Sequence, residues 1–152
     1  MKIVGIIAEY NPFHNGHLYH IKEAKKQTGA DFVIVIMSGN FVQRGSPAII
    51  NKYARCRFAI ESGADLVIEL PVIYSTSSAE FFALGAISLL DQLGIVDFVC
   101  FGSETNDIKS LTSIAKYLIM NPDGYNKDIN RYVKSGVTFP KARQKSIIKN
   151  NP

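Results

Sequence analysis

The chain has 152 residues and a formal net charge of +4, and 47% of its residues are hydrophobic. This composition is typical of one globular domain with its own core, and it excludes a disordered protein. No apolar run reaches the length of a membrane span, and the first residues lack a secretory pattern, so we expect a cytoplasmic protein without membrane contact. Cys56 and Cys100 lie in apolar segments at no metal-like spacing, which indicates buried free thiols.

The positive charge is concentrated at the end of the chain. Residues 1–126 contain ten Lys or Arg and twelve Asp or Glu, whereas residues 127–152 contain seven basic residues and one acid, Asp128. Such a segment is typical either of a surface that contacts a polyanion such as RNA or of a solvated helix face, and charge alone slightly favours the solvated face. The basic residues are Lys127, Arg131, Lys134, Lys141, Arg143, Lys145 and Lys149.

The first apolar run, Lys2–Ala8, predicts a parallel strand that is covered on both faces. Pro12 has no N–H group and ends the pairing. The spacing of apolar residues then predicts an amphipathic helix over His17–Gln27 that ends at Gly29.

Three further strands and three further helices are predicted along the chain up to residue 120. Asn51 is expected to cap the second helix, and Ser77-Ser78-Ala79-Glu80 is interpreted as a capping box for the third. The third helix is apolar over much of its surface, so we expect it to be well buried. The predicted strands are Asp31–Met37, Asp65–Leu70 and Val96–Phe101, and the helices are Asn51–Ser62, Ser78–Leu93 and Ile108–Met120.

The last part of the chain is predicted to begin with a turn at Asn121-Pro122-Asp123-Gly124. Two short helices follow, Tyr125–Ser135 and Pro140–Lys149, with a hinge at Gly136.

Four alternations of strand and helix predict an α/β fold with a doubly wound parallel sheet. Ligands of such sheets bind beyond the carboxyl ends of the strands, where the strand order reverses. Four loops follow the predicted strands, and we expect them to converge on one pocket. They are Glu9–Gly16, Ser38–Pro47, Pro71–Ser77 and Gly102–Asp107.

The first of these loops contains the residues that point most clearly to chemistry. His14, Asn15, Gly16 and His17 lie where a helix begins, and the free N–H groups of a helix N-terminus favour an anion. Two imidazoles add hydrogen-bond donors, and preplaced donors stabilise the charge that grows on phosphate oxygens during phosphoryl or nucleotidyl transfer. His20 lies one turn later and either joins the site or forms a local hydrogen bond.

Three other interpretations of this loop are less favoured. We would interpret a single histidine as a solvated surface residue. We do not interpret His14 and His17 in this way, because they flank a glycine directly after a buried strand. A metal site is disfavoured because helical geometry turns His20 away from His14, so we predict no metal ligands. The dinucleotide fingerprint Gly-x-Gly-x-x-Gly is absent after the first strand.

The other loops allow two readings each. Ser38, Asn40 and Arg44 either position a substrate carboxylate or phosphate or belong to an ordinary surface connection. Gly102 either admits a nucleotide base or ribose close to the backbone or begins a helix turn, and its place beyond a strand mildly favours the first reading. Glu9 is either a site carboxylate or paired locally.

His14-Asn15-Gly16-His17 resembles the His-x-Gly-His signature of the nucleotidyltransferase superfamily. The longer stretches Gly5–His17, Met37–Gly45, Ala64–Pro71 and Phe101–Glu104 together resemble the bacterial tRNA(Met) cytidine acetate ligase family. The likeness covers essentially the whole chain.

The resemblance implies a Rossmann-like nucleotidyltransferase fold and an enzyme that uses ATP, accompanied by Mg²⁺, to convert acetate to acetyl-adenylate. The acetyl group would then pass to N4 of the wobble cytidine of elongator tRNA(Met). His14 and His17 would be catalytic and would stabilise the α-phosphate and the leaving pyrophosphate, and Gly102 would pack against the nucleotide. The ATP cradle would consist of Ile7, Ala8, Glu9, Tyr10, Asn11, Pro12, Phe13, His14, Asn15, Gly16, His17, Leu18, Tyr19 and His20.

The same resemblance implies an ATP-binding domain over residues 1–124 and a basic helical tail over 125–152 that continues it. Family members extend well beyond this length, so we expect the chain to correspond to their N-terminal part, with tRNA bound by the tail and by a C-terminal part. Two alternatives stay open at this point: a small-molecule adenylyltransferase of coenzyme biosynthesis, and a non-catalytic nucleotide-binding fragment.

Overall fold

The computed structural model describes residues 1–120 and 123–150. They form two compact units, the first from Met1 to Gly102 and the second from Ser103 onward. Each unit has its own apolar core. None of the helices in the described part of the chain is long and apolar enough to cross a membrane.

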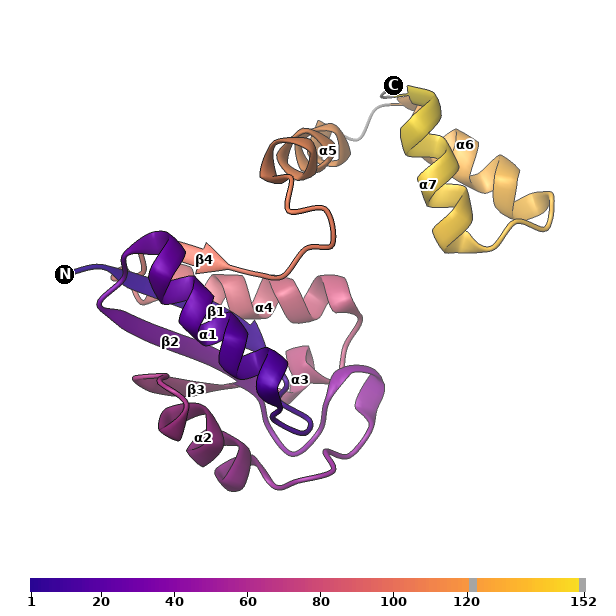
Figure 1. The fold of residues 1–152 in the computed structure, drawn as a ribbon. Coiled ribbons are helices and arrows are strands. Elements are labelled where there is room, and N and C mark those ends of the chain that lie inside the picture. Colours follow the sequence, from indigo (N-terminus) through magenta and orange to yellow (C-terminus); the bar gives the residue numbers. More distant parts are fainter. Residues whose placement is uncertain (121–122, 151–152) are drawn as a thin grey trace. The chain divides into compact units, whose positions relative to one another are not determined.

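The first unit is built on a four-stranded parallel sheet (Figure 1). Its strand order is β3-β2-β1-β4, which confirms the predicted doubly wound arrangement. The chain moves outward from β1 to β3 and then returns to the other side of β1, so the order reverses between β1 and β4. The strands span β1 (Ile3–Ala8), β2 (Phe32–Ser38), β3 (Leu66–Leu70) and β4 (Phe98–Cys100).

An aspartate precedes each of β2, β3 and β4, which explains why these strands begin later than the apolar pattern predicted. Each carboxylate accepts the backbone N–H group at the start of a neighbouring strand and so extends the hydrogen-bond ladder from outside. The acceptors are Asp31, Asp65 and Asp97, and the donors are the N–H groups of Lys2, Val33 and Ile3, at 2.8, 2.8 and 2.7 Å respectively.

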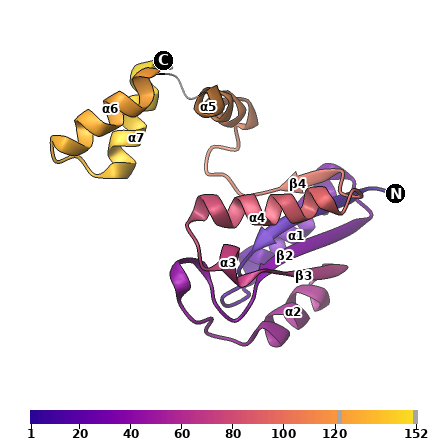
Figure 2. The ribbon, with the colours of Figure 1, turned by 180° about the vertical axis from the view of Figure 1, so that it is seen from behind.

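Helices cover both faces of the sheet (Figures 1 and 2). On one face, α1 (Asn15–Thr28) and α2 (Lys52–Glu61) pack their small and apolar residues against every second side chain of β1 and β2. On the other face, α4 (Ala79–Gln92) packs Phe82, Ala86 and Leu90 against the alternate side chains. This alternation is what a strand that is buried on both sides requires.

Most predicted helix ends are confirmed, but α1 begins at Asn15, two residues before the predicted start at His17, and the cap of the third helix also differs. Gly29 adopts the left-handed conformation after α1, with φ of 62°, and the Asn51 side chain accepts the Ala54 N–H group. The third predicted helix is capped by Ser78, whose side chain accepts the Phe81 N–H group. The predicted capping box between Ser77 and Glu80 is therefore wrong by one position, because Glu80 lies in the first turn without reaching the N3 position.

The expectation that this third helix, α4, is well buried is also wrong for half of its apolar residues. Phe82 and Leu90 are buried, whereas Phe81 and Leu84 are 56% and 55% exposed. The helix is apolar on more sides than the single face that contacts the sheet. Two short helical segments inside loops were not predicted: the 3₁₀ turn η1 (Gln43–Gly45) and α3 (Val72–Ser75).

The second unit contains three helices, of which α6 and α7 pack closely against each other. Its core is formed by Tyr125, Ile129 and Ala142, with Tyr117 of α5 in edge-on contact with Tyr125 at 5.9 Å between ring centroids. The helices span α5 (Ile108–Met120), α6 (Asp123–Lys134) and α7 (Phe139–Asn150).

The predicted helices in this unit are confirmed, and α6 begins two residues earlier than expected. The predicted turn is wrong for Asp123 and Gly124, which belong to α6, whereas Asn121 and Pro122 lie outside the described residues. The division into an ATP-binding domain over 1–124 and a tail over 125–152 stays a prediction.

Candidate functional site

The turn between β1 and α1 is held by an aromatic cluster. Tyr10 is buried and takes a left-handed backbone conformation with φ of 51°, and a cis peptide bond joins Asn11 to Pro12. The Tyr10 ring contacts the rings of Phe13 and His17 edge-on, both at 4.8 Å between centroids. The chain thus turns sharply from the sheet into α1 around a buried ring.

The two histidines of the signature form a reciprocal cap at the start of α1. His14 is the N-cap residue, and its Nδ1 accepts the Gly16 N–H group at 3.1 Å. His17, at position N3, accepts the His14 N–H group with its own Nδ1 at 3.2 Å. This is a capping box in which imidazoles replace the usual Ser or Thr and Glu or Gln side chains.

The reciprocal cap determines which ring nitrogen carries the proton. A nitrogen that accepts an N–H bond must present its lone pair, so in neutral His14 and His17 the proton lies on Nε2. The two rings stack at 3.7 Å between centroids with an interplanar angle of 23°. Two Nε2–H donors therefore lie side by side at the N-terminal end of α1.

The electrostatic environment keeps His17 neutral. Burial lowers the pKa of His17, and the neighbouring His14 and His20 lower it further. Burial also lowers the pKa of His20, whose Nε2 is buried without a hydrogen-bond partner among the described residues. The first turn of α1 contains no acidic residue that would compete with an anion. The His17 donor and the positive end of the helix dipole thus act together.

Gly16 is required by this arrangement. A Cβ atom at position 16 would lie 2.9 Å from Cε1 of His14, so any larger residue would displace the capping ring.

Burial raises the pKa of Tyr10, whose hydroxyl is also buried without a partner in the described part of the chain.

The remaining residues of the predicted cradle surround this cap. Ile7, Ala8 and Glu9 are half-buried at the end of β1, and Leu18 is half-buried on α1. Asn15 and Tyr19 are exposed on α1.

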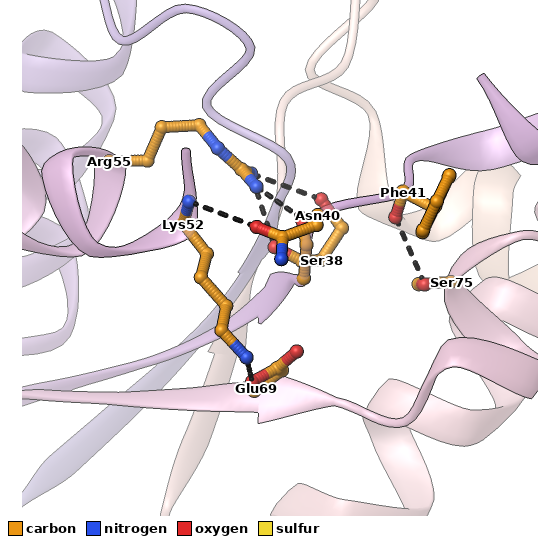
Figure 3. Close-up of polar contacts among 8 residues, drawn as sticks. Ser38, Asn40, Phe41, Lys52, Arg55, Glu69 and Ser75 are labelled. Atoms are coloured by element: carbon orange, nitrogen blue, oxygen red, sulfur yellow. Dashed lines mark hydrogen bonds and ion pairs between the residues drawn. The ribbon is translucent and has the colours of Figure 1, made fainter. Parts of the chain in front are cut away.

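Three of the four predicted loops converge through hydrogen bonds. The Glu9 carboxylate accepts the Gln43 N–H group at 2.8 Å, so Glu9 is paired with a residue of the second loop. The Asn11 side chain accepts the Ile49 N–H group at 2.7 Å. Ser75 of α3 donates to the carbonyl of Phe41 at 3.1 Å, as Figure 3 shows. The fourth loop, Gly102–Asp107, begins at the end of the first unit and continues into the second.

Arg55 of α2 connects these loops, and sequence reasoning missed it. Its side chain is fully buried, and its guanidinium donates to the carbonyls of Ile50 at 2.9 Å and Ser38 at 3.1 Å. It also donates to the carbonyls of Glu9 and Gly39. Burial lowers the pKa of Arg55, and the charges of Glu9 and Glu69 partly offset this. One side chain therefore joins the end of β1 to the end of β2. A signal was present, because Arg55 lies four residues before the buried Ala59 on the same helix face.

The predicted substrate-loop residues occupy three different environments. Ser38 is fully buried, and its carbonyl and hydroxyl both accept from Arg55. Asn40 is exposed and lies beside the start of α2, where its side chain accepts the Lys52 N–H group at 3.4 Å. Arg44 is exposed in η1, in a left-handed conformation with φ of 65°. The structure thus brings Ser38 to the cradle through Arg55 and leaves Asn40 and Arg44 at the surface.

Gly102 lies just beyond β4, at the side of β1 where the strand order reverses. A Cβ atom there would meet no described atom within 4 Å apart from its chain neighbours.

No group of three or more His, Cys, Asp or Glu side chains in residues 1–120 and 123–150 is placed to hold a metal ion. Cys56 and Cys100 are free, as predicted, but half-buried, so the expectation of full burial is wrong.

Comparison with known proteins identifies the family. The sequence profile of the HIGH Nucleotidyl Transferase family matches residues 1–151. The chain is 53% identical over 149 residues to a tRNA(Met) cytidine acetate ligase of Acetivibrio thermocellus, and 56% identical over 154 residues to one of Thermoanaerobacter sp.. These alignments cover 98% and 99% of this chain but 36% and 38% of the relatives.

Among solved structures, the chain resembles Thermotoga maritima TmcAL bound with alpha-thio ATP, with a TM-score of 0.91 and 47% identity. That match covers 99% of this chain and 36% of the other. These findings confirm the predicted resemblance and the nucleotidyltransferase fold. The chain belongs to the HIGH nucleotidyl transferase family.

Proposed function

We propose that the β1–α1 turn binds the phosphates of ATP and that the protein uses this ATP to activate acetate. In the first step a carboxylate oxygen of acetate attacks the α-phosphorus, acetyl-adenylate forms, and pyrophosphate leaves. In the second step N4 of the wobble cytidine of elongator tRNA(Met) attacks the acyl carbon, and AMP leaves. The names of the relatives support tRNA(Met), cytidine and acetate as substrates, and the alpha-thio ATP in the Thermotoga maritima structure supports ATP.

The observation that carries the proposal is the reciprocal histidine cap. Negative charge on the phosphate oxygens grows in the transition state of the first step, and donors that are already oriented stabilise it without reorganisation. The Nε2–H groups of His14 and His17 have this property, because the cap determines both ring orientations. The exposed Gly16 leaves room for a phosphate close to the backbone. ATP would bring Mg²⁺ with its phosphates.

Gly102 is proposed to lie against the base or ribose of ATP. It is on the β4 side of β1, next to the point of reversal, and a Cβ atom at this position would meet no described atom within 4 Å apart from its chain neighbours. The roles of Ser38, Asn40 and Arg44 in holding a substrate remain a proposal, and the burial of Ser38 under Arg55 favours an indirect role for that residue.

The basic tail is proposed to contact the tRNA. All seven of its Lys and Arg side chains are exposed. Asp128 pairs with Lys149 at 2.8 Å and with Arg131 at 3.5 Å, while Lys127, Lys134 and Lys141 show no ion pair within the described residues. Exposed, unneutralised charge favours phosphate contacts that are sensitive to salt. These proposed substrates assign the reaction to the cytoplasm.

The test measures acetate-dependent exchange between ATP and pyrophosphate in the complete gene product. Two variants remove the imidazole Nε2–H groups, and with them the oriented donors, but keep the cap. In His14→Asn the amide oxygen replaces Nδ1 as a good N-cap acceptor, and in His17→Gln the N3 residue is the one that ordinary capping boxes use. We expect each to lower the exchange rate by about 10²–10³-fold, the loss typical of one transition-state donor.

The matched control is Lys22→Gln, an exposed residue of the same helix outside the proposed cradle, which should leave exchange unchanged. Wild-type exchange in both histidine variants would contradict the proposal. Pyrophosphate release with a phosphorylated coenzyme precursor in place of acetate would indicate a small-molecule adenylyltransferase. ATP binding without any exchange would indicate a non-catalytic nucleotide-binding protein.

A further inference from the structure

A recess lies on the α2 side of the sheet, and its lining includes none of the residues of the histidine cap. Its volume is about 250 Å³, and it lies between α2 and the last residues of β2 and β3. Its lining is mixed, with apolar side chains, one aromatic ring and a pair of opposite charges. The lining residues are Met37, Lys52, Tyr53, Cys56, Val67 and Glu69.

The charged pair leaves hydrogen-bonding capacity for a ligand. Lys52 Nζ lies 2.6 Å from Glu69 Oε2, and Figure 3 shows the lysine reaching from α2 down to the glutamate on β3. The two side chains are 26% and 49% exposed, so both can be reached from solvent. An ammonium has three donors and a carboxylate about four acceptor sites, so the pair uses only part of either. The recess therefore presents a donor and an acceptor side by side.

An aromatic side chain stands at the rim. Tyr53 is 77% exposed, which is unusual for so large a ring on a packed helix. Lys52 Nζ lies 5.5 Å from the Tyr53 ring centroid, so the ring is at the same end of the recess as the charged pair. An exposed ring beside an apolar recess is the arrangement on which nucleic-acid bases stack.

These features select a neutral, planar ligand. A fully charged ligand would disturb the neutral Lys52–Glu69 pair and would have to leave water for an apolar lining. A pyrimidine with an exocyclic amine fits, because its N–H₂ group donates to a carboxylate and its ring nitrogen accepts from an ammonium. Carboxylates accept from N4 of cytosine in nucleic-acid recognition generally, and enzymes that act on a base read this edge after the base leaves its stack.

We infer that this recess holds the cytosine base that accepts the acetyl group, with Glu69 accepting from N4, Lys52 donating to N3 and Tyr53 stacking at the rim. The inference rests on the proposed function and names the place of its second substrate.

Adenine presents a similar pair of groups, so the topology has to separate the two bases. The strand order reverses between β1 and β4, and Gly102 lies there, whereas the recess lies beside β2 and β3 on the opposite side of β1. If ATP binds where the strand order reverses, between β1 and β4, this recess stays available for the cytidine of the tRNA. Arg55 links the two places, since it binds the carbonyls of Glu9 and Gly39, and Gly39 has no side chain because Glu69 occupies that space.

The experiment separates the two half-reactions of the complete gene product. In the double variant Lys52→Met/Glu69→Met both partners become apolar groups of similar length, a change that is often nearly neutral for folding. The control, Arg57→Met/Glu61→Met, removes an exposed ion pair from the same helix. We expect acetate-dependent ATP–pyrophosphate exchange to stay at the control level and kcat/KM for tRNA acetylation to fall at least about tenfold, the loss of one or two charged hydrogen bonds.

Two further measurements address the ring and the base. Tyr53→Ala should lower kcat/KM for tRNA acetylation about tenfold. Tyr53→Phe should leave it unchanged, because only the alanine variant loses the stacking surface. Free cytidine should inhibit tRNA acetylation more strongly than uridine, whose O4 would face the Glu69 carboxylate with a lone pair.

The inference is overturned if the double variant acetylates tRNA as well as the control, or if it raises the KM for ATP in the exchange reaction, which would assign the recess to adenine. An absence of acetate-dependent exchange in the wild-type protein is a different result, since it contradicts the proposed function itself.

Discussion

The β1–α1 turn and the α6–α7 pair hold their polar side chains in place by contacts of very different range. At the turn, the hydrogen bonds of Glu9 with Gln43, Asn11 with Ile49 and Arg55 with Glu9 join residues 34, 38 and 46 positions apart. In the α6–α7 pair, the contacts of Asp128 with Lys149 and Tyr125 with Arg143 join residues 21 and 18 positions apart. The first site exists only when the sheet is folded, whereas the second needs only two helices.

This difference separates a site from a surface. Long-range bonds between side chains and backbone N–H or carbonyl groups determine the course of the loops and therefore the direction in which the histidines point. The basic side chains of the α6–α7 pair are all exposed, and Lys127, Lys134 and Lys141 form no ion pair within the described residues. A rigid site suits phosphate chemistry that depends on geometry, and an exposed basic surface suits contact with a polyanion.

The largest effect is expected at Arg55. In Arg55→Met the carbonyls of Glu9, Ser38, Gly39 and Ile50 lose a common buried donor, and each unsatisfied polar group costs about 1–3 kcal/mol, so the free energy of unfolding should fall by at least about 3 kcal/mol. Urea unfolding measures this. Arg57→Met, on the exposed side of the same helix, is the control and should change little. Equal losses in the two variants would mean that long-range bonds do not support the turn.

The next effect concerns the basic surface. In Lys134→Ala/Lys141→Ala two exposed cations are lost, so the slope of log K for tRNA binding against log salt should become shallower by about 2. Binding at several salt concentrations measures this slope. Lys22→Ala/Lys26→Ala removes two exposed lysines of α1 and serves as the control. A slope that is unaltered in the first variant, or altered equally in both, would argue against a tRNA contact at the tail.

A smaller effect is expected when the local pairing of the second unit is broken. Asp128 is 7% exposed and pairs with two basic residues, so Asp128→Asn should lower the local stability of α6 and α7 by about 1 kcal/mol. Hydrogen exchange of the amides of both helices measures the change. The exchange of amides in β1 and β2 should stay as in the wild-type protein, and faster exchange there would show that the two regions are not independent.

The smallest effect is the pH dependence of the histidine cap. The pKa of His17 lies below its ordinary value of 6.5 in the folded protein, so the folded state favours the neutral ring. Its contribution to stability is complete above pH 6.5 and is lost as the pH falls through the lowered folded pKa. The unfolding free energy of His17→Gln, measured against pH, should lack this contribution. Parallel pH curves for the variant and the wild-type protein would contradict the lowered pKa of His17.

Much of the first unit could be predicted because its signals are local. Apolar runs bounded by Gly and Pro identify strands that are buried on both faces, and Gly29 and Asn51 mark helix ends by their own backbone and side-chain chemistry. The His14–His17 cradle could also be predicted, because the strand before it and the helix after it are both recognisable in the sequence around it.

What could not be predicted depends on packing between distant segments. The spacing of Arg55 from Ala59 indicates a buried face of the helix, but it does not tell that carbonyls at the end of β1 and along the β2–α2 connection meet the guanidinium. The apolar residues of α4 do not reveal which of them face the sheet, so Phe81 and Leu84 were expected to be buried. The histidine cap itself was missed because imidazoles rarely take the places of serine and glutamate in a capping box.

The reciprocal cap has a consequence for motion at the start of α1. Helix ends open and close locally at low cost, and here each opening would break the same Nδ1 contacts that orient the two Nε2–H donors. The first turn of the helix and the phosphate site must therefore fray together. A nucleotide that engages the donors would in turn slow the exchange of the His14 and Gly16 amides, which makes these two N–H groups a direct reporter of an occupied site.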